Sequence, residues 1–179
     1  HLRYLFMLSP SWAFGVPAFA LMAAATVILT VAVLHFIGVI PQEVFFGDSW
    51  TIVAGFMLTT GHIGLIMQAA THFYGVKQGY RELNPLFGRM ARVLTLEHAL
   101  VIGGALLLLS AACLAAIGVW WRDLGFAALP TTVPLVCAVT IGAIGLQTAL
   151  GGFLLAVISG NEAQFAADPA APAGPASGA

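Results

Sequence analysis

The chain has 179 residues, of which 60% are hydrophobic and only 7% are charged, against roughly 25% charged in an ordinary soluble domain. Its net charge of −1 and its 6 basic residues exclude an extended phosphate-binding surface, so we expect no nucleic-acid partner. Long stretches without any charge each exceed the ~20 apolar residues that cross a bilayer as a helix. The composition therefore predicts an all-α integral membrane protein.

The first segment, residues 1–12, has the sequence HLRYLFMLSPSW. This pattern is typical of a short amphipathic helix in the membrane interface, interrupted at Pro10. The apolar run from Tyr4 is longer than the ~7–15 residues of a signal-peptide core, so we do not expect a cleaved signal. Because the sequence begins with His1 and not with Met, we expect that it is not a complete translation product.

We predict four membrane-spanning helices, over residues 16–39, 50–75, 97–121 and 133–159. Pro17 and Pro134 fall in first turns, where a missing N–H costs little. All tryptophans fall at the span ends: Trp12, Trp50, Trp120 and Trp121. This placement is typical of the aromatic belt at the membrane interface. The tail, residues 161–179, is rich in Ala, Pro and Gly, and we predict that it is disordered.

Basic residues are concentrated between the second and third spans: Lys77, Arg81, Arg89 and Arg92. The loop after the first span has none and is acidic. The positive-inside rule therefore predicts that both termini and the 76–96 loop are cytoplasmic. Asn84 and Pro85 form a good helix start, and apolar residues follow on one face with Arg89 and Arg92 on the other. We predict a second interfacial amphipathic helix over residues 84–95.

Two polar residues fall near span centres, His62 in the second span and Gln147 in the fourth. We expect the two spans, taken as antiparallel, to be joined by a hydrogen bond between these side chains. The alternative is a proton or ligand site, because ionisable groups inside the membrane often mark function.

His72 and His98 lie about ten residues from their span centres, roughly 15 Å from the membrane midplane. Two histidines at one depth raise the hypothesis of a bound haem, although isolated interfacial histidines are the simpler interpretation. Cys113 and Cys137 fall in apolar runs and are interpreted as small hydrophobic residues. The sequence shows no catalytic constellation and no metal-ligand cluster, so it leaves open whether the chain is part of an enzyme.

Small residues recur within the spans, in TTGHIG (59–64), at Gly103 and Gly104, and in GAIGLQTALGG (142–152). They allow helix backbones to approach closely. We therefore expect them to form contacts within a helix bundle or between copies in an oligomer.

Motifs in three places resemble the membrane region of bacterial polyprenyl-phosphate glycosyltransferases of glycosyltransferase family 2, relatives of dolichyl-phosphate mannose synthase. The entry into the first span is similar to the family's SP-x-W/F-x-F-x-x-P, at Ser9, Pro10, Trp12, Phe14 and Pro17. RVLTLEHALVIGGALLLL resembles its F-T/S-L-E-R-G opening of the third span, with His98 where Arg is usual. IGAIGLQTALGGFLLAVI resembles its L-G-L-Q-T final span, with Gln147 and Thr148.

The resemblance implies transfer of a sugar from a nucleotide donor to polyprenyl phosphate at the cytoplasmic leaflet of the bacterial inner membrane. The catalytic residues, the divalent metal and the nucleotide sugar would belong to a soluble domain upstream of this chain. The membrane part would anchor that domain, form oligomer contacts and help to place the carrier. Arg81, Arg89 and Arg92, with Lys77, would pair with the lipid phosphate. Alternatively, these residues only set the topology and hold anionic lipids.

Two other functions stay open at this point. The chain could be a non-catalytic membrane subunit of a larger complex, packed through the small residues of its second and fourth spans. A haem or quinone protein using His72 and His98 is the other alternative.

Overall fold

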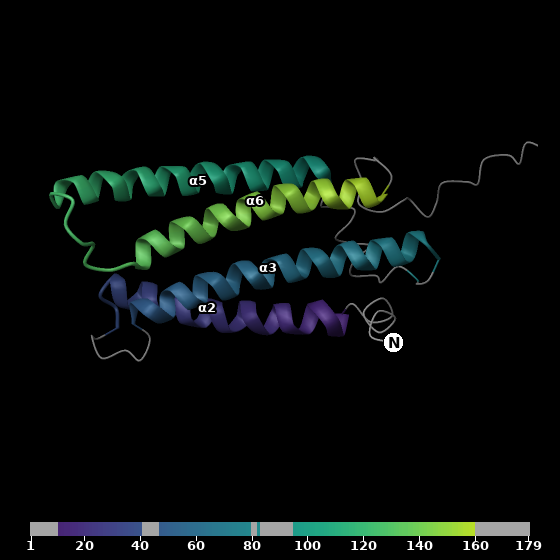
Figure 1. Ribbon diagram of the computed structural model, residues 1–179, viewed down its shortest axis with the longest axis horizontal. Coiled ribbons are helices and arrows are strands. Elements are labelled where there is room, and N and C mark those ends of the chain that lie inside the picture. Colours follow the sequence, from purple (N-terminus) through teal and green to yellow (C-terminus); the bar gives the residue numbers. More distant parts are fainter. Residues whose placement is uncertain (1–10, 41–46, 80–81, 83–94, 160–179) are drawn as a thin grey trace, which may run out of the picture.

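The computed structural model describes residues 11–40, 47–79, 82 and 95–159, and within these residues it contains helices and no strand. A short π-helix, η1 (Ser11–Gly15), leads into α2 (Val16–Phe36), which is followed by α3 (Asp48–Lys77), α5 (Leu96–Asp123) and α6 (Val133–Ser159) (Figure 1). The described residues contain 4 helical segments that are long and apolar enough to cross a membrane. The predicted all-α membrane fold with four spans is therefore confirmed.

The first span begins earlier than its predicted start at residue 16. Pro17 has no N–H and its ring would clash with the carbonyl of Ala13, four residues before it. The chain instead forms the wider π-helical turn Ser11–Gly15 directly before α2. Ser11 and Trp12 were predicted to end a separate interfacial helix, but they are continuous with the first span, and residues 1–10 lie outside the described residues.

The third span begins at a side-chain cap. Thr95 has an extended backbone, with φ −77° and ψ 165°, and its Oγ1 accepts a hydrogen bond from the N–H of His98 at 3.4 Å. This is the ordinary N-cap geometry, which satisfies an N–H without a partner inside the helix. Thr95 was predicted to end the interfacial helix 84–95, and this part of the prediction was wrong. The rest of that helix, and the tail 161–179, lie outside the described residues.

The helices lie side by side in the order α2, α3, α6, α5 (Figure 1). Consequently α3 and α6 form the centre, and each also packs against the partner that is its neighbour in the sequence. Asp48 at the start of α3 contacts Thr131 just before α6, and Lys77 at the end of α3 contacts Ile158 at the end of α6. The two helices therefore run parallel, and the expectation of antiparallel spans was wrong, because two successive hairpins give the second and fourth spans the same direction.

Glycine residues allow the backbones to touch at the helix interfaces. A Cβ on Gly103 of α5 would lie 2.6 Å from the carbonyl oxygen of Gly145 on α6. A Cβ on Gly61 of α3 would lie 2.8 Å from the carbonyl oxygen of Ala18 on α2. Such approaches maximise van der Waals contact, which is what associates helices in lipid. Many of the predicted small residues thus form contacts within the chain. Gly104 is an exception, because a Cβ placed there would meet no atom within 4 Å.

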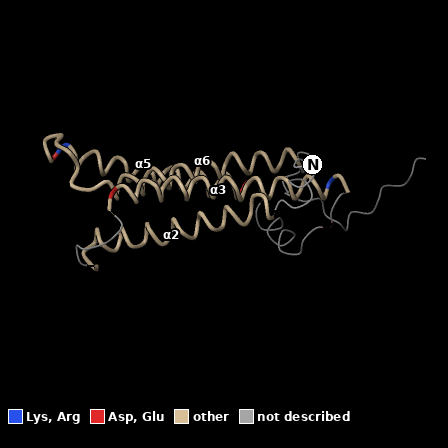
Figure 2. The backbone as a smooth tube through the Cα atoms, turned by 60° about the horizontal axis from the view of Figure 1, so that its bottom comes forward, with Lys and Arg blue, Asp and Glu red and all other residues tan. Residues whose placement is uncertain are grey.

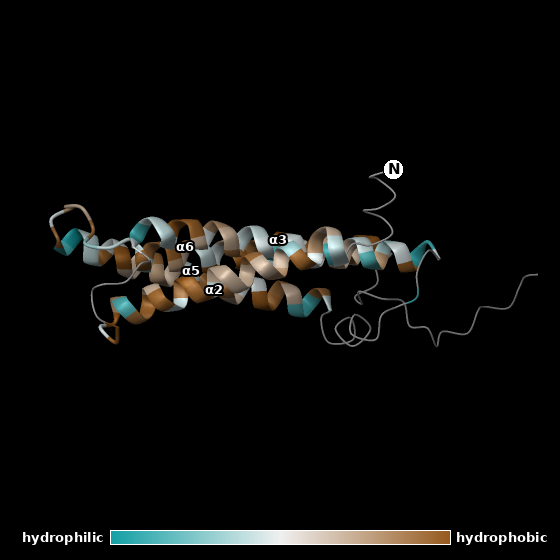
Figure 3. Cartoon of the chain, turned by 90° about the horizontal axis from the view of Figure 1, so that it is seen from below, coloured by the Kyte–Doolittle hydropathy of each residue, from teal (hydrophilic) through white to brown (hydrophobic). Residues whose placement is uncertain are grey.

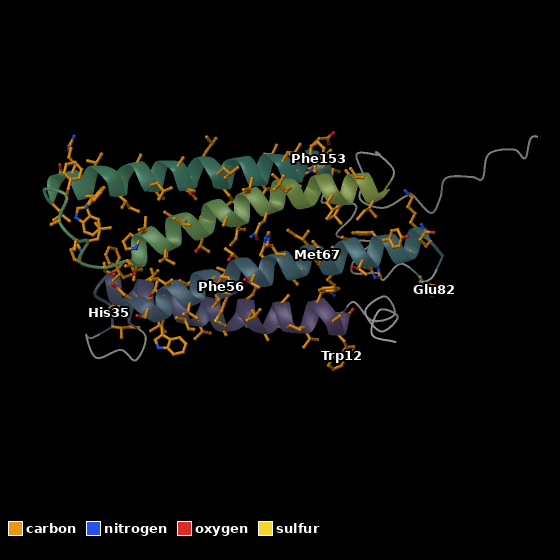
Figure 4. All side chains as sticks on the ribbon, viewed as in Figure 1. Trp12, His35, Phe56, Met67, Glu82 and Phe153 are labelled. Carbon is orange, nitrogen blue, oxygen red and sulfur yellow. The ribbon has the colours of Figure 1, made fainter. Side chains whose placement is uncertain are left out.

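The charged residues among those described lie toward the two ends of the bundle (Figure 2), and the helices between them are mostly apolar (Figure 3). Asp48, Arg122 and Asp123 lie at one end, here called the Asp48 end. The opposite end, which carries Lys77, is called the Lys77 end. Large apolar side chains such as Leu108 and Phe153 are exposed, and Figure 4 shows side chains projecting outward from the helices. This distribution is the one expected of helices surrounded by lipid.

Candidate functional site

The interface between α3 and α6 is held by polar contacts at both ends and in the middle. In the middle, Nδ1 of His62 lies 3.0 Å from Oε1 of Gln147. With the amide oxygen as acceptor, the ring donates from Nδ1, which fixes the tautomer of a neutral histidine. The two side chains that were predicted to meet from their common depth thus lie in contact in the structure.

The other ring nitrogen of His62 has a weaker partner. Its Nε2 lies 3.5 Å from Oγ1 of Thr148, and that hydroxyl donates to the carbonyl of Ile144 at 2.7 Å. The shorter bond uses the only proton of the hydroxyl, so the contact with the ring adds little. The arrangement is that of a hydrogen bond joining two helices, and within the described residues no charged side chain hydrogen-bonds to this ring.

At the Asp48 end, the carboxylate of Asp48 connects α3 to the beginning of α6. The hydroxyl of Thr131 donates to Oδ1 at 3.0 Å, and the N–H of Thr132 donates to Oδ2 at 3.2 Å. The carboxylate therefore lies beside the N-terminal ends of two helices, where a negative charge is favourable. In the sequence, Asp48 stood out only as part of the acidic loop after the first span. An acidic residue at the start of a helix was the available signal, but the second helix end could not be inferred from it.

At the Lys77 end, the side chain of Lys77 connects α3 to the end of α6. Nζ of Lys77 donates to the carbonyl oxygen of Ile158 at 2.8 Å. The last carbonyls of a helix have no partner within that helix, and a cation near them also interacts favourably with the helix dipole. Lys77 was predicted to bind lipid phosphate together with Arg81, Arg89 and Arg92. Those three residues lie outside the described residues, so the phosphate site stays a prediction, and the ammonium of Lys77 already has one partner.

The two histidines of the haem hypothesis have different surroundings. His72 on α3 is buried, with its ring edge-to-face with Phe73 and the ring centroids 6.0 Å apart. His98 in the first turn of α5 is exposed, and its Nδ1 lies 2.8 Å from Oγ1 of the capping Thr95. In the part of the chain that the structure describes, no group of three or more His, Cys, Asp and Glu side chains could hold a metal ion. His72 thus packs inside the bundle and His98 bonds to the helix cap, and the haem hypothesis stays a prediction.

Comparison with known proteins identifies relatives for most of this region. The model of the family described as the glycosyltransferase family 2 C-terminal transmembrane region matches residues 69–159. The low-salt glycan biosynthesis hexosyltransferase Agl6 of Haloferax volcanii is 29% identical over 155 residues, which make up 87% of this chain and 37% of Agl6. The chain thus spans little more than a third of the length of that relative. No solved structure matches this chain.

The family match includes the basic residues of the predicted phosphate site, the cap at Thr95 and the end of α6. It begins after His62, so one partner of the His62–Gln147 hydrogen bond lies outside the matched residues and the other lies inside them.

Proposed function

The chain belongs to the family of glycosyltransferase family 2 C-terminal transmembrane regions, and on this premise we propose that it anchors a glycosyltransferase in the membrane and presents polyprenyl phosphate to it. The family match is the observation that carries the proposal, and the hexosyltransferase relative supports it. Sugar transfer from a nucleotide donor would take place in a soluble domain outside this sequence. Any divalent metal would be bound there, since the described residues offer no fitting group of ligands.

The carrier phosphate would bind at the Lys77 end. The stretch from Lys77 to Arg92 holds 4 of the 6 basic residues of the chain, so the positive-inside rule makes this end cytoplasmic. Guanidinium groups can pair with a phosphate through two parallel hydrogen bonds, so Arg81, Arg89 and Arg92 are the proposed ligands. The bond from Lys77 to Ile158 supports this assignment indirectly, because it fixes the point at which the basic segment leaves α3.

The membrane helices supply a firm base for this end of the molecule. Phe73 on α3, Ala99 on α5 and Leu155 on α6 form one buried cluster close to Lys77. Three helices therefore pack together near the end of α3, from which the chain continues toward the basic residues.

The proposal is tested by exchanging Arg89 and Arg92 together for Gln in the full-length protein, reconstituted in nanodiscs that contain polyprenyl phosphate. We expect binding to weaken by at least tenfold, since each basic residue near the membrane surface contributes about 1 kcal/mol and a tenfold change is about 1.4 kcal/mol. Topology should not change, because Lys77 and Arg81 remain. Arg122→Gln, at the opposite end, is the control and should leave binding unchanged. Equal binding by the double variant and the wild type would mean that these arginines only set the topology and do not bind the phosphate.

A further inference from the structure

The arginines proposed to bind the carrier phosphate belong to residues 78–95, which connect α3 to α5. This connection begins after Lys77, the last residue of α3, and ends before Leu96, the first residue of α5. The helices lie in the order α2, α3, α6, α5, so α6 lies between the two helices that hold the connection (Figure 1). The separation of its two ends therefore depends on how α3 and α5 each pack against α6.

On the α3 side, two contacts hold the end of the helix against α6. Nζ of Lys77 donates a hydrogen bond to the carbonyl oxygen of Ile158 at 2.8 Å. About one turn earlier in α3, Phe73 is buried in a cluster that also contains Leu155 of α6. A charge-assisted hydrogen bond and a packed ring on neighbouring turns both oppose a shift of the end of α3 relative to α6.

On the α5 side, the contact with α6 is a close approach of two small residues. Ala99 of α5 is only 1% exposed, and a Cβ placed on Gly152 of α6 would overlap the Cβ of Ala99. Carbon atoms in favourable contact lie about 3.5–4.0 Å apart, so a second methyl group here would force α5 away from α6. Ala99 lies about 4.5 Å from Leu96 along the helix. Such a shift would therefore move the point at which the connection ends.

We propose that Gly152 and Ala99 are positioning residues for the carrier site, because their contact sets the separation between the end of α3 and the start of α5. The conformations open to a connection of fixed length depend on the separation of its ends. A bidentate pair of Arg with phosphate requires a defined geometry, so a changed separation weakens the binding of polyprenyl phosphate. Neither side chain can pair with a phosphate, and both act through the position of Leu96. The inference rests on the proposed function, which assigns the carrier to this connection.

The contact can be varied without changing any charge. The wild type has one methyl group between the two backbones, on Ala99. Gly152→Ala gives two methyl groups, Ala99→Gly gives none, and the double variant again has one, now on α6. The Cβ added to Gly152 in the double variant would lie 3.8 Å from the Cα at position 99 and 3.8 Å from Cδ1 of Leu96, which is ordinary contact. The double variant should therefore restore the spacing of α5 and α6 that each single variant disturbs.

The test measures binding of polyprenyl phosphate to the full-length protein in nanodiscs, at a temperature at which each variant is folded. We expect both single variants to bind more weakly, Gly152→Ala by about tenfold, which corresponds to about 1.4 kcal/mol. The double variant should bind like the wild type. Gly61→Ala is the matched control, because its Cβ would lie 2.8 Å from the carbonyl oxygen of Ala18 and would overpack α3 against α2 instead. It should leave binding unchanged although it destabilises the bundle.

Wild-type binding by the single variants would overturn the inference, and so would a loss that the double variant does not restore. An equal loss for Gly61→Ala would overturn it too, because general destabilisation would then be the cause. If Gly152→Ala does not fold, Ala99→Gly and the double variant decide the question, since neither contains the clash. The variant with Arg89 and Arg92 exchanged for Gln is measured alongside. If it binds like the wild type, the proposed function fails as well, and if it alone binds weakly, only this inference fails.

Discussion

The two interfaces of α6 differ in how many polar contacts hold them. Against α5, its neighbour in the sequence, α6 packs by backbone approach at Gly103 and Gly145, with one buried hydrogen bond from the hydroxyl of Ser110 to the carbonyl oxygen of Ala138 at 2.8 Å. Against α3, which is distant in the sequence, it is held by Asp48, by the His62–Gln147 pair and by Lys77. A short connection already brings α5 and α6 together, so close packing and this one hydrogen bond suffice there. Helices that are far apart in the chain gain specificity from polar contacts, which few other positions in an apolar bundle can satisfy.

The direction of the helices explains why charges lie at both ends of α3 and α6. The antiparallel pair α5 and α6 places opposite dipole ends together, which is favourable. The parallel pair α3 and α6 places like dipole ends together, which is unfavourable. Asp48 lies beside two helix N-termini and Lys77 beside two C-termini, so each charge opposes the partial charge of two helices at once.

The largest expected effect comes from the backbone contact between α5 and α6. Gly103→Ala places a Cβ against the carbonyl oxygen of Gly145, and overpacking of this kind costs about 1–3 kcal/mol. The matched variant Gly104→Ala meets nothing within 4 Å. Thermal unfolding in detergent should therefore show a melting temperature lowered by several degrees for Gly103→Ala only. Equal melting temperatures for the two variants would mean that α5 and α6 do not approach as closely as described.

A smaller effect is expected at the end of the α3–α6 interface. Asp48→Ala removes the acceptor of the Thr131 hydroxyl and the Thr132 N–H, and loss of a capping side chain costs about 0.5–2 kcal/mol. Asp123→Ala is the control, because the ion pair of Asp123 with Arg122 is exposed and such pairs contribute little. Chemical denaturation should show a lower free energy of unfolding for Asp48→Ala and little change for Asp123→Ala. A loss for Asp123→Ala as large as that for Asp48→Ala would contradict the assigned role of Asp48.

The smallest effect is expected in the middle of the interface. A hydrogen bond between membrane helices contributes about 0.6 kcal/mol on average, so His62→Leu and Gln147→Leu should each be mildly destabilising. The double variant should lose less than the two single losses together, because the second substitution removes a group that the first has already left unpaired. Strict additivity would show that the 3.0 Å contact contributes nothing to stability.

The sequence was sufficient for the spans because their evidence is local: each span is a long apolar run between charges. It was also sufficient to pair His62 with Gln147, since polar side chains at one membrane depth have few alternatives. The sequence did not predict the contacts that depend on which helix ends lie together. The contacts of Asp48 with Thr131 and of Lys77 with Ile158 are of this kind. The third span was predicted from residue 97, one residue after the start of α5 at Leu96, but the cap at Thr95 was missed because apolar periodicity continues across the boundary.

Photolabelling would show whether this chain presents polyprenyl phosphate at its Lys77 end, as we propose. A polyprenyl phosphate with a photoreactive group beside the phosphate would be added to nanodiscs holding the full-length protein, and the labelled residues would be mapped. We expect the label to be concentrated in residues 77–95 and to be competed away by unlabelled polyprenyl phosphate but not by phosphatidylglycerol. Label distributed over both ends of the bundle, or competed equally by phosphatidylglycerol, would contradict it.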